Sequence, residues 1–295
     1  MMIRFKVVKA SKLLLFFAIV LLFAATCFIM VRYSLSREPQ IQTTSAELVH
    51  SAAETQTVFA ARGMDVEVVR PARRSVLIYH THTHEAYEQV KDDPYEALEA
   101  WRTADAGHSV LRVGAELAKC LRAEGFEVVH DTTDHENDAL STAYTRSLRT
   151  LEGYERRFDL YIDLHRDAWY KGMKTRYTDA DGTPLAQPMV LIGNGAGFDV
   201  KPHTEENLAF AEALTARINA NHPGLCKDVL VKDGRYNQHI GVFSVLIEFG
   251  HNKNTLREAL NTAPIVAKAI REVFEDPDIA RLAGSWHTPY VLFTE

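Results

Sequence analysis

The stretch SVLIYHTHTHEAY, residues 75–87, joins a short apolar run to three histidines at alternate positions. The run at 75–80 has the length and aliphatic content of a buried β-strand. His80, His82 and His84 close the run, and Glu85 comes directly after them. Imidazole and carboxylate groups at the end of a buried strand indicate either half of a metal site or a surface ladder of histidines. The other strands of the chain must discriminate between these interpretations.

Beyond residue 75, candidate strands alternate with candidate helices. Apolar runs predict strands, whereas amphipathic stretches predict helices. The predicted strands cover residues 75–80, 126–131, 158–167, 188–195 and 242–250. The predicted helices cover residues 108–125, 140–157, 204–224 and 255–276. This order predicts an α/β fold with a mixed, mostly parallel sheet and helices on both faces, in which ligands bind at the carboxyl ends of the strands.

The N-terminal region has a different composition. Residues 13–31 form an uncharged apolar run long enough to cross a bilayer as a helix, and residues 1–12 are basic. The positive-inside rule keeps the basic end in the cytoplasm and places the remainder of the chain outside it, although a cleaved signal peptide is an alternative. We therefore expect a single-pass protein of the cell membrane. A flexible tether over 32–74 would carry an extracytoplasmic catalytic domain over 75–295.

Charge and cysteine content exclude several functions. The formal net charge is −6, and the chain has no dense stripe of lysine and arginine, so nucleic acid is not an expected partner. The three cysteines Cys27, Cys120 and Cys226 form no paired motif. Neither a disulfide framework nor a thiol-based site is therefore expected.

Three of the predicted strands end on histidine or glutamate, and they come from distant parts of the chain. The first leads to His82 and Glu85, the third to His165, and the last to Glu248. A zinc hydrolase needs three protein ligands, an open position for water, and a carboxylate that takes the proton of that water. The pattern predicts a Zn²⁺ site formed by His82, Glu85 and His165, with Glu248 as general base. A buried glutamate without a partner would be costly, which supports a functional role for Glu248.

Two ligand assignments stay open in the sequence. Alternation along an extended segment places His80 on the same face as His82, so His80 is the rival of His82 as a ligand. His108 begins a predicted helix and is the rival of Glu85. His84 is interpreted as a bystander that points away from His82 or into solvent.

Further candidates surround the predicted site. Arg166 follows His165 and is a candidate catalytic cation. The loop GRYNQH, residues 234–239, carries amide groups, and Asn237 and Gln238 are candidate substrate-binding residues. Ordinary turn chemistry explains that loop equally well.

Several motifs together resemble a known family. LIYHTHTHEAY, YIDLHRDA, YNQH and VLIEFG followed by NTLREA are similar to the stage II sporulation protein P family, over about residues 75–274. These are membrane-anchored peptidoglycan hydrolases of endospore-forming bacteria. The resemblance implies a fold related to the zinc-dependent cell-wall amidases and an N-acetylmuramoyl-L-alanine amidase activity, with endopeptidase activity also ascribed to the family. Matched by motif, His82, Glu85 and His165 fall at the metal-binding positions and Glu248 at the acidic position of the last strand.

The resemblance also implies a setting and partners. The family acts in septal wall degradation during engulfment, with a lytic transglycosylase and a membrane engulfment protein. Two other functions compete with the amidase. A zinc carboxypeptidase-like peptidase would use the same ligands, with Arg166 binding the terminal carboxylate of its substrate. A membrane-tethered wall-binding scaffold would keep the fold without the chemistry.

Overall fold

The computed structural model describes residues 73–137 and 139–287. The basic segment 1–12, the expected membrane helix 13–31 and all but the last two residues of the expected tether 32–74 lie outside this part of the chain. Within these two ranges, no helix is both long and apolar enough to cross a bilayer.

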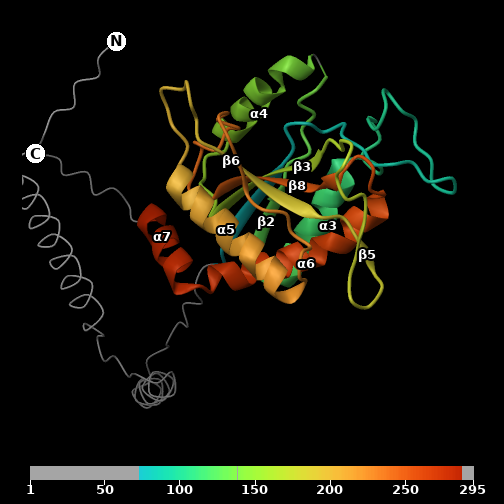
Figure 1. Ribbon diagram of the computed structural model, residues 1–295. Helices are drawn as coiled ribbons and strands as arrows, with labels where there is room; N and C mark the ends of the chain where they lie inside the picture. The colour runs from blue at the N-terminus through green and yellow to red at the C-terminus, as the bar shows by residue number, and fades with distance from the viewer. Residues whose placement is uncertain (1–72, 138, 288–295) are drawn as a thin grey trace, which may run out of the picture. The chain divides into compact units, whose positions relative to one another are not determined.

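A six-stranded sheet forms the centre of the fold, with the strand order β2-β1-β3-β8-β6-β7 (Figure 1). Its strands are β1 (Ser75–Tyr79), β2 (Glu127–His130), β3 (Leu160–Asp167), β6 (Pro188–Gly193), β7 (Leu230–Lys232) and β8 (Ser244–His251). The first four strands in this order are parallel to one another. Strand β6 is antiparallel to β8 and parallel to β7. The expected mixed, mostly parallel sheet is confirmed.

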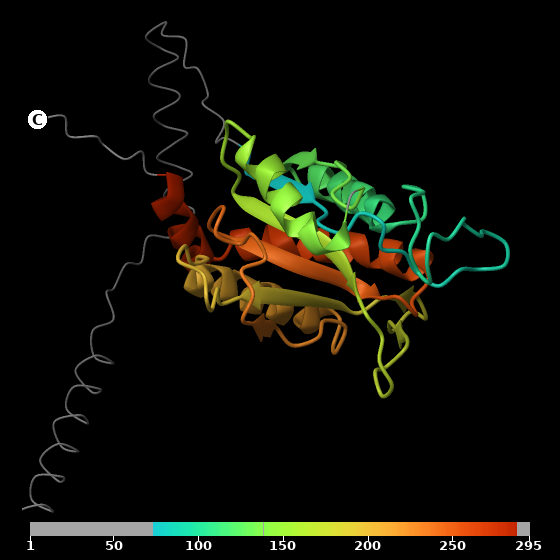
Figure 2. The same ribbon diagram turned by 90° about the horizontal axis from the view of Figure 1, so that it is seen from above.

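Helices cover both faces of the sheet, as expected. Helices α3 (Val110–Ala123), α5 (Thr204–Asn221) and α6 (Leu256–Phe274) pack together against one face. The opposite face carries α4 (Ala143–Glu152), which follows the short helix η1 (Leu140–Thr142) (Figure 1). Figure 2 turns the molecule and shows β8 and β6 lying side by side. The chain also has a small antiparallel pair, β4 (Tyr177–Thr178) and β5 (Pro184–Leu185), and a last helix, α7 (Pro277–His287).

Alternation along the strands separates two apolar clusters. In β1, Val76 and Ile78 join the large cluster beneath α3 and α6, whereas Leu77 and Tyr79 join the smaller cluster beside α4. The same period of two in β3 places Tyr161 in the smaller cluster. Side chains at odd positions of β3 therefore point to the α4 side of the sheet, and His165 is one of them.

The register between β3 and β8 decides where the polar residues meet. Ile247 and Phe249 of β8 belong to the large cluster, so Glu248 between them faces the α4 side. His165 is paired with Glu248 across the two parallel strands. A register shift follows between His165 and Asp167, where the regular ladder ends. Two residues that are far apart in the sequence thus become neighbours on one face.

Candidate metal site at the strand ends

His82, Glu85 and His165 come together on the α4 side, at the carboxyl ends of β1 and β3. The imidazole centroids of His82 and His165 are 5.3 Å apart. Nδ1 of His165 lies 3.4 Å from Oε2 of Glu85. All three side chains are more than three-quarters buried, so the functional groups face one another rather than bulk solvent. The structure thus brings together the three residues that the sequence suggested as ligands.

Glu136, in the loop after β2, orients His82. Nδ1 of His82 donates to Oε1 of Glu136 at 2.7 Å, which leaves Nε2 of His82 for another partner. Oε2 of Glu136 accepts from the guanidinium of Arg102 at 2.7 Å and from the backbone N–H of His84 at 2.9 Å. Burial opposes the charge on Glu136, but these donors outweigh it and lower the pKa of Glu136 to about 2. Glu136 therefore remains a charged acceptor at neutral pH.

Asp163 lies against the ring of His165, as Glu136 lies against the ring of His82. Nε2 of His165 lies 2.8 Å from Oδ1 of Asp163, although the pair is not aligned as a hydrogen bond. Asp163 itself is fixed by Thr81, whose backbone N–H and hydroxyl donate to it at 2.8 and 2.7 Å. Burial alone would lower the pKa of His165, but the carboxylates of Asp163 and Glu85 dominate and raise it well above its usual value. A cationic imidazole or a bound metal ion would each balance this negative charge.

Arg166 fixes Glu85 and the loop that follows it. The backbone N–H of Arg166 donates to Oε2 of Glu85 at 3.0 Å, and the guanidinium lies 3.7 Å from Oε1. The same guanidinium donates to the backbone carbonyls of Ala86 and Trp101 at 3.0 and 3.1 Å. Burial raises the pKa of Glu85, but His165 and Arg166 together outweigh burial and lower it. Arg166 thus keeps Glu85 ionised. It also joins the two ends of the loop that runs from Ala86 to Trp101.

Glu248 carries a buried oxygen without a partner. Its Oε2 atom accepts no hydrogen bond from the described residues. Burial raises the pKa of Glu248 to about 8. The charge of His165 opposes this rise, whereas the negative charge of Glu85 adds to it. An unpaired buried carboxyl group is unfavourable unless another group or a substrate completes it. This feature distinguishes Glu248 from the carboxylates that hold the histidines.

The donor set suits a zinc ion. Among the described residues, no group of three His, Cys, Asp or Glu side chains is already arranged around a common metal position. The types nevertheless match those of catalytic zinc sites, which combine two imidazoles with one carboxylate and leave a position open. Glu136 and Asp163 supply the carboxylates that commonly orient zinc-binding histidines. The buried Oε2 atom of Glu248, which has no hydrogen-bond partner among the described residues, adds to the fit. His82, Glu85 and His165 are therefore the residues that would hold the ion.

His80 does not share the environment of His82, because β1 ends at Tyr79 and the alternation ends with it. Its ring is fully buried between the sheet and α3, where it would lie 2.5 Å from a Cβ added at Gly114. Nδ1 of His80 donates to the carbonyl of Leu164, and Nε2 accepts from Nε2 of His130, both at 2.9 Å. The expectation that His80 and His82 face the same way is wrong. Both ring nitrogens of His80 already have protein partners.

His108 lies away from the cluster. Its two ring nitrogens contact Asp105 at 2.7 Å and Asp93 at 3.0 Å, on an exposed part of the loop before α3. His84 is also engaged, with Nε2 2.9 Å from Asp134. His84 is mostly buried and shares Glu136 with His82, so it does not point into solvent.

Asn237 and Gln238 have their amide groups bonded within the protein. Nδ2 of Asn237 donates to the carbonyl of Tyr144 at 2.9 Å and to the hydroxyl of Ser147 at 3.0 Å. Gln238 accepts from the N–H of Gly193 at 2.8 Å and donates to the carbonyl of Leu191 at 2.9 Å. The two residues tie their loop to α4 and β6. A direct contact of either with substrate stays a prediction.

Sequence reasoning assigned no role to Glu136, Asp163 or Tyr144. Asp163 lies two positions before His165 on the same strand, so the period of two could have found it. Glu136 had no such signal, because it follows a strand end in an irregular loop. Tyr144 lies in the first turn of α4, and its ring centroid lies 5.7 Å from that of His82.

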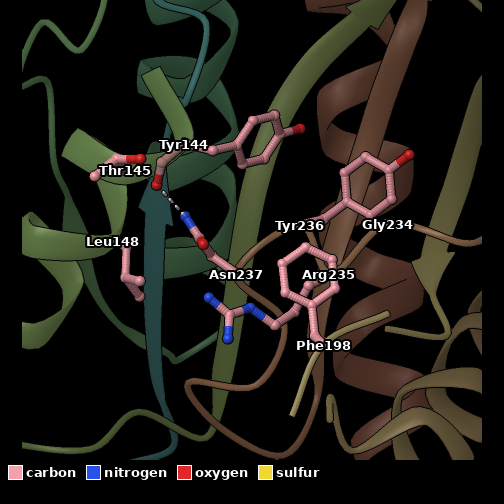
Figure 3. Close-up of a pocket in the computed structure, with 8 residues that line it drawn as sticks. All are labelled: Tyr144, Thr145, Leu148, Phe198, Gly234, Arg235, Tyr236 and Asn237. Carbon is pink, nitrogen blue, oxygen red and sulfur yellow. Dashed lines mark hydrogen bonds between the residues drawn. The ribbon is translucent and has the colours of Figure 1, made fainter. Parts of the chain in front are cut away.

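A groove lies beside Tyr144, which Figure 3 shows with the other residues that line it. It has a volume of about 490 Å³ and runs between α4 and the loop at residues 234–237. The rings of Tyr144, Tyr236 and Phe198 line it, together with Leu148 and the guanidinium of Arg235. The ring centroids of Tyr144 and Tyr236 are 5.8 Å apart.

Together, the fold and this cluster define an α/β protein with a candidate metal centre at the carboxyl ends of its parallel strands. The chain belongs to the stage II sporulation protein P (SpoIIP) family, whose model matches residues 33–271. It is thus a sporulation protein. The stage II sporulation protein P of Bacillus subtilis (strain 168) is 26% identical over 229 residues, which are 72% of this chain and 54% of that protein. The chain therefore spans about half the length of this curated relative.

Several solved structures show a distant likeness to this chain. The CwlD amidase from Clostridioides difficile, solved in complex with the GerS lipoprotein, is 12% identical with a TM-score of 0.46, over 71% of this chain and 100% of that one. The catalytic domain of the CD27L endolysin, which targets Clostridia difficile, is 16% identical with a TM-score of 0.43, over 68% and 96%. The amidase AmiC2 of Nostoc punctiforme is 14% identical with a TM-score of 0.41, over 73% and 99%.

Proposed function

We propose that this protein is a peptidoglycan hydrolase, a zinc-dependent N-acetylmuramoyl-L-alanine amidase that degrades septal wall during sporulation. The observation that carries the proposal is the meeting of His82, Glu85 and His165 on one face of the sheet with Glu248, whose Oε2 atom is buried without a hydrogen-bond partner. Membership of a sporulation family supports the biological context. The substrate would be the amide that joins the lactyl group of muramic acid to the stem peptide.

In the proposed hydrolysis of the amide, the protein's own residues would hold the metal ion, orient its ligands and transfer the proton. His82, Glu85 and His165 would hold a Zn²⁺ ion, which supplies a Lewis acid for the scissile carbonyl and lowers the pKa of water from about 15.7 to about 7. Glu136 and Asp163 fix the two imidazoles, so little reorganisation is needed when substrate binds. Glu248 would accept the proton of the attacking water and then deliver it to the leaving amine. A neighbouring cation would lower the raised pKa of Glu248 and so favour the carboxylate form that a base requires.

Arg166 and Tyr144 would support this chemistry. Arg166 keeps Glu85 ionised and anchors the loop between Ala86 and Trp101. Burial first, and then the charge of Asp163, raise the pKa of Tyr144, so its hydroxyl stays protonated and can donate a hydrogen bond to substrate.

The alternatives receive less support from the contacts. A carboxypeptidase would need Arg166 as a free cation, whereas its guanidinium already donates to two backbone carbonyls. A scaffold without chemistry leaves the unpaired Glu248 unexplained. Endopeptidase activity would use the same centre and remains part of the proposal.

The family and the N-terminal sequence support a proposal for the cellular setting. We propose a single-pass membrane protein with its hydrolase domain outside the cytoplasm, anchored by residues 13–31 and extended by a tether. A lytic transglycosylase and a membrane engulfment protein are the proposed partners, with peptidoglycan as substrate.

The direct test is mass spectrometry of products released from purified peptidoglycan, with and without a chelator. The amidase releases intact stem peptides, an endopeptidase cuts within the peptide, and a scaffold releases nothing. Chelator should abolish release, and full activity of metal-free protein would overturn the zinc assignment.

A substitution separates catalysis from metal binding. Glu248→Gln should retain zinc yet lose about 10²- to 10⁴-fold in rate, because a positioned general base contributes about that much. Glu96→Gln makes the same chemical change at an exposed site and serves as the matched control. Wild-type turnover by Glu248→Gln would remove Glu248 from the mechanism.

A further inference from the structure

The groove beside Tyr144 contains the side chain of Arg235, whose positive charge is paired with no carboxylate of the described residues. In the described part of the chain, the guanidinium of Arg235 makes neither an ion pair nor a hydrogen bond, and its Nε atom is buried without a partner. Its carbon Cζ lies 4.8 Å from the centroid of the Phe198 ring, which holds the group in the groove (Figure 3). The carboxylate of the preceding Asp233 is engaged by the side-chain amide of Asn194. A partly buried guanidinium whose donors have no protein partner favours a carboxylate ligand.

The wall of the groove is held in a strained shape. Tyr236 and Asn237 have φ values of 48° and 54°, in the left-handed region that residues other than glycine seldom adopt. The bonds from Asn237 to Tyr144 and Ser147 hold this conformation against α4. The Tyr236 ring also packs closely on Gly234, where an added Cβ would lie 2.4 Å from the ring and would displace it. Strain of this kind persists where the surroundings enforce it, and it is concentrated at ligand sites.

The groove and the candidate metal site lie on either side of one tyrosine ring. The Tyr144 ring stands between them, 5.7 Å from the His82 ring and 5.8 Å from the Tyr236 ring, measured between centroids. A ligand with its scissile bond at His82 and Glu248 would thus pass Tyr144 and extend along the groove. The flat rings of Tyr144, Tyr236 and Phe198 offer apolar surface to a peptide backbone or a small side chain.

We propose that this groove is the subsite for the acidic peptide of the substrate, and that Arg235 selects it by pairing with a peptide carboxylate. The inference rests on the proposed function, because it assigns a part of the same substrate to a place beside the same centre. Arg235 is a specificity residue in this scheme, since it touches the ligand at a distance from the bond that breaks. Asn237 then acts indirectly, by holding Tyr236 in place.

Equilibrium binding tests the subsite independently of hydrolysis. The probes are N-acetylmuramoyl-L-alanyl-D-glutamate and its amide analogue, in which amides replace both carboxylates of the glutamate. Titration calorimetry on the whole chain carrying Glu248→Gln should show tighter binding of the acid. Adding Arg235→Gln should weaken binding of the acid by about 10-fold, because a charge-assisted hydrogen bond contributes about that factor or more. Binding of the amide should change less.

Controls distinguish charge, shape and fold. Arg257→Gln removes an exposed arginine away from the groove and should leave both affinities unchanged. Arg235→Lys should restore part of the preference for the acid. Leu148→Glu places a negative charge in the groove and should weaken binding of the acid more than that of the amide. The circular dichroism spectrum of each variant checks its fold.

The outcomes separate this inference from the proposed function. Equal affinities for acid and amide, or an Arg235→Gln variant that behaves as Arg257→Gln does, would overturn the subsite even if wild-type protein cleaves peptidoglycan. A preference for the acid that depends on Arg235, in a protein that cleaves nothing, would support the subsite and overturn the hydrolase. A preference for the amide would also overturn the role of Arg235.

Discussion

Each histidine of the candidate metal site is backed by a carboxylate on its other ring nitrogen. Glu136 accepts from Nδ1 of His82, which directs Nε2 into the site. Asp163 lies beside Nε2 of His165, which directs Nδ1 toward Glu85. The two imidazoles thus present different nitrogens to the same space. Such carboxylates raise the basicity of the ligand and restrict the rotation of its ring.

Removing one of these carboxylates should weaken metal binding. We expect Glu136→Gln to reduce zinc affinity by about 10- to 100-fold, because His82 loses a charged acceptor. Competition with a fluorescent chelator measures the affinity. Glu127→Gln removes an exposed carboxylate that pairs with Arg156 and should leave the affinity within about twofold of wild type. Unchanged zinc binding in Glu136→Gln would show that Glu136 does not support a ligand.

At the scale of single elements, the start of α6 is defined by a capping box. The hydroxyl of Thr255 accepts from the N–H of Glu258 at 3.3 Å, and the carboxylate of Glu258 accepts from the N–H of Thr255 at 2.8 Å. Glu258 also accepts from the side chain of Asn254 at 3.0 Å. These bonds fix the chain directly after β8, the strand that carries Glu248.

Loss of this cap should destabilise the domain. Thr255→Ala is expected to lower the free energy of unfolding by about 1 kcal/mol, the usual effect of losing an N-cap hydroxyl. Thr255→Ser keeps the hydroxyl and should retain most of the stability. Urea denaturation followed by circular dichroism measures both. Equal losses in the two variants would show that the methyl group, and not the cap, is responsible.

The end of β2 holds a histidine whose protonation the fold opposes. Burial, and then the charge of Arg122, lower the pKa of His130 to about 4, below its usual 6.5. The unfolded chain therefore binds more protons than the folded chain between these values, and stability falls as the pH falls from about 6.5 to about 4. Protonation of His108 has the opposite effect on stability, because Asp93 and Asp105 raise the pKa of His108 in the folded chain.

Separate substitutions of His130 and His108 should show which of them lowers stability at acidic pH. His130→Gln should reduce the loss of stability below pH 6.5, whereas His108→Gln should not reduce it. Urea midpoints measured from pH 4 to pH 7 in the presence of a chelator exclude effects of bound metal. An unaltered pH dependence in His130→Gln would show that another group titrates.

At the scale of the whole molecule, a metal ion held by residues from β3 and the loop after β1 should stabilise the fold. These elements are far apart in the sequence, so the unfolded chain cannot hold the ion in the same way. At a free zinc concentration of 100 times Kd, the linkage contributes about 2.7 kcal/mol. This corresponds to a rise in Tm of roughly 5–11 °C for a domain of this size. Differential scanning calorimetry with zinc and then with excess chelator measures it.

Two histidine variants test whether the rise in Tm comes from zinc bound at the candidate site. His165→Gln should show no rise in Tm at the same zinc concentration. His203→Gln alters a histidine before α5, away from the cluster, and should respond as wild type does. A similar rise in all three proteins would indicate zinc binding elsewhere on the chain.

The principal strands were predictable because short, mainly apolar segments give a clear pattern. The expected strands at 75–80, 126–131, 158–167, 188–195 and 242–250 each match a strand of the sheet within a few residues. The shorter elements were not predictable. β4, β5 and β7 have two or three residues each, too few for a period to appear. Their pairing depends on neighbours that are distant in the sequence.

By itself, the sequence determined the α/β class and the candidate set of His82, Glu85, His165 and Glu248, because local pattern decides strands and strand ends are where such folds bind ligands. Only the tertiary structure separated His80 from His82, since alternation stops where a strand stops. It alone also recruited Glu136, 54 residues beyond His82, and opened the groove at Arg235. Those features depend on register, loop path and side-chain pairing across the sheet, which no local pattern encodes.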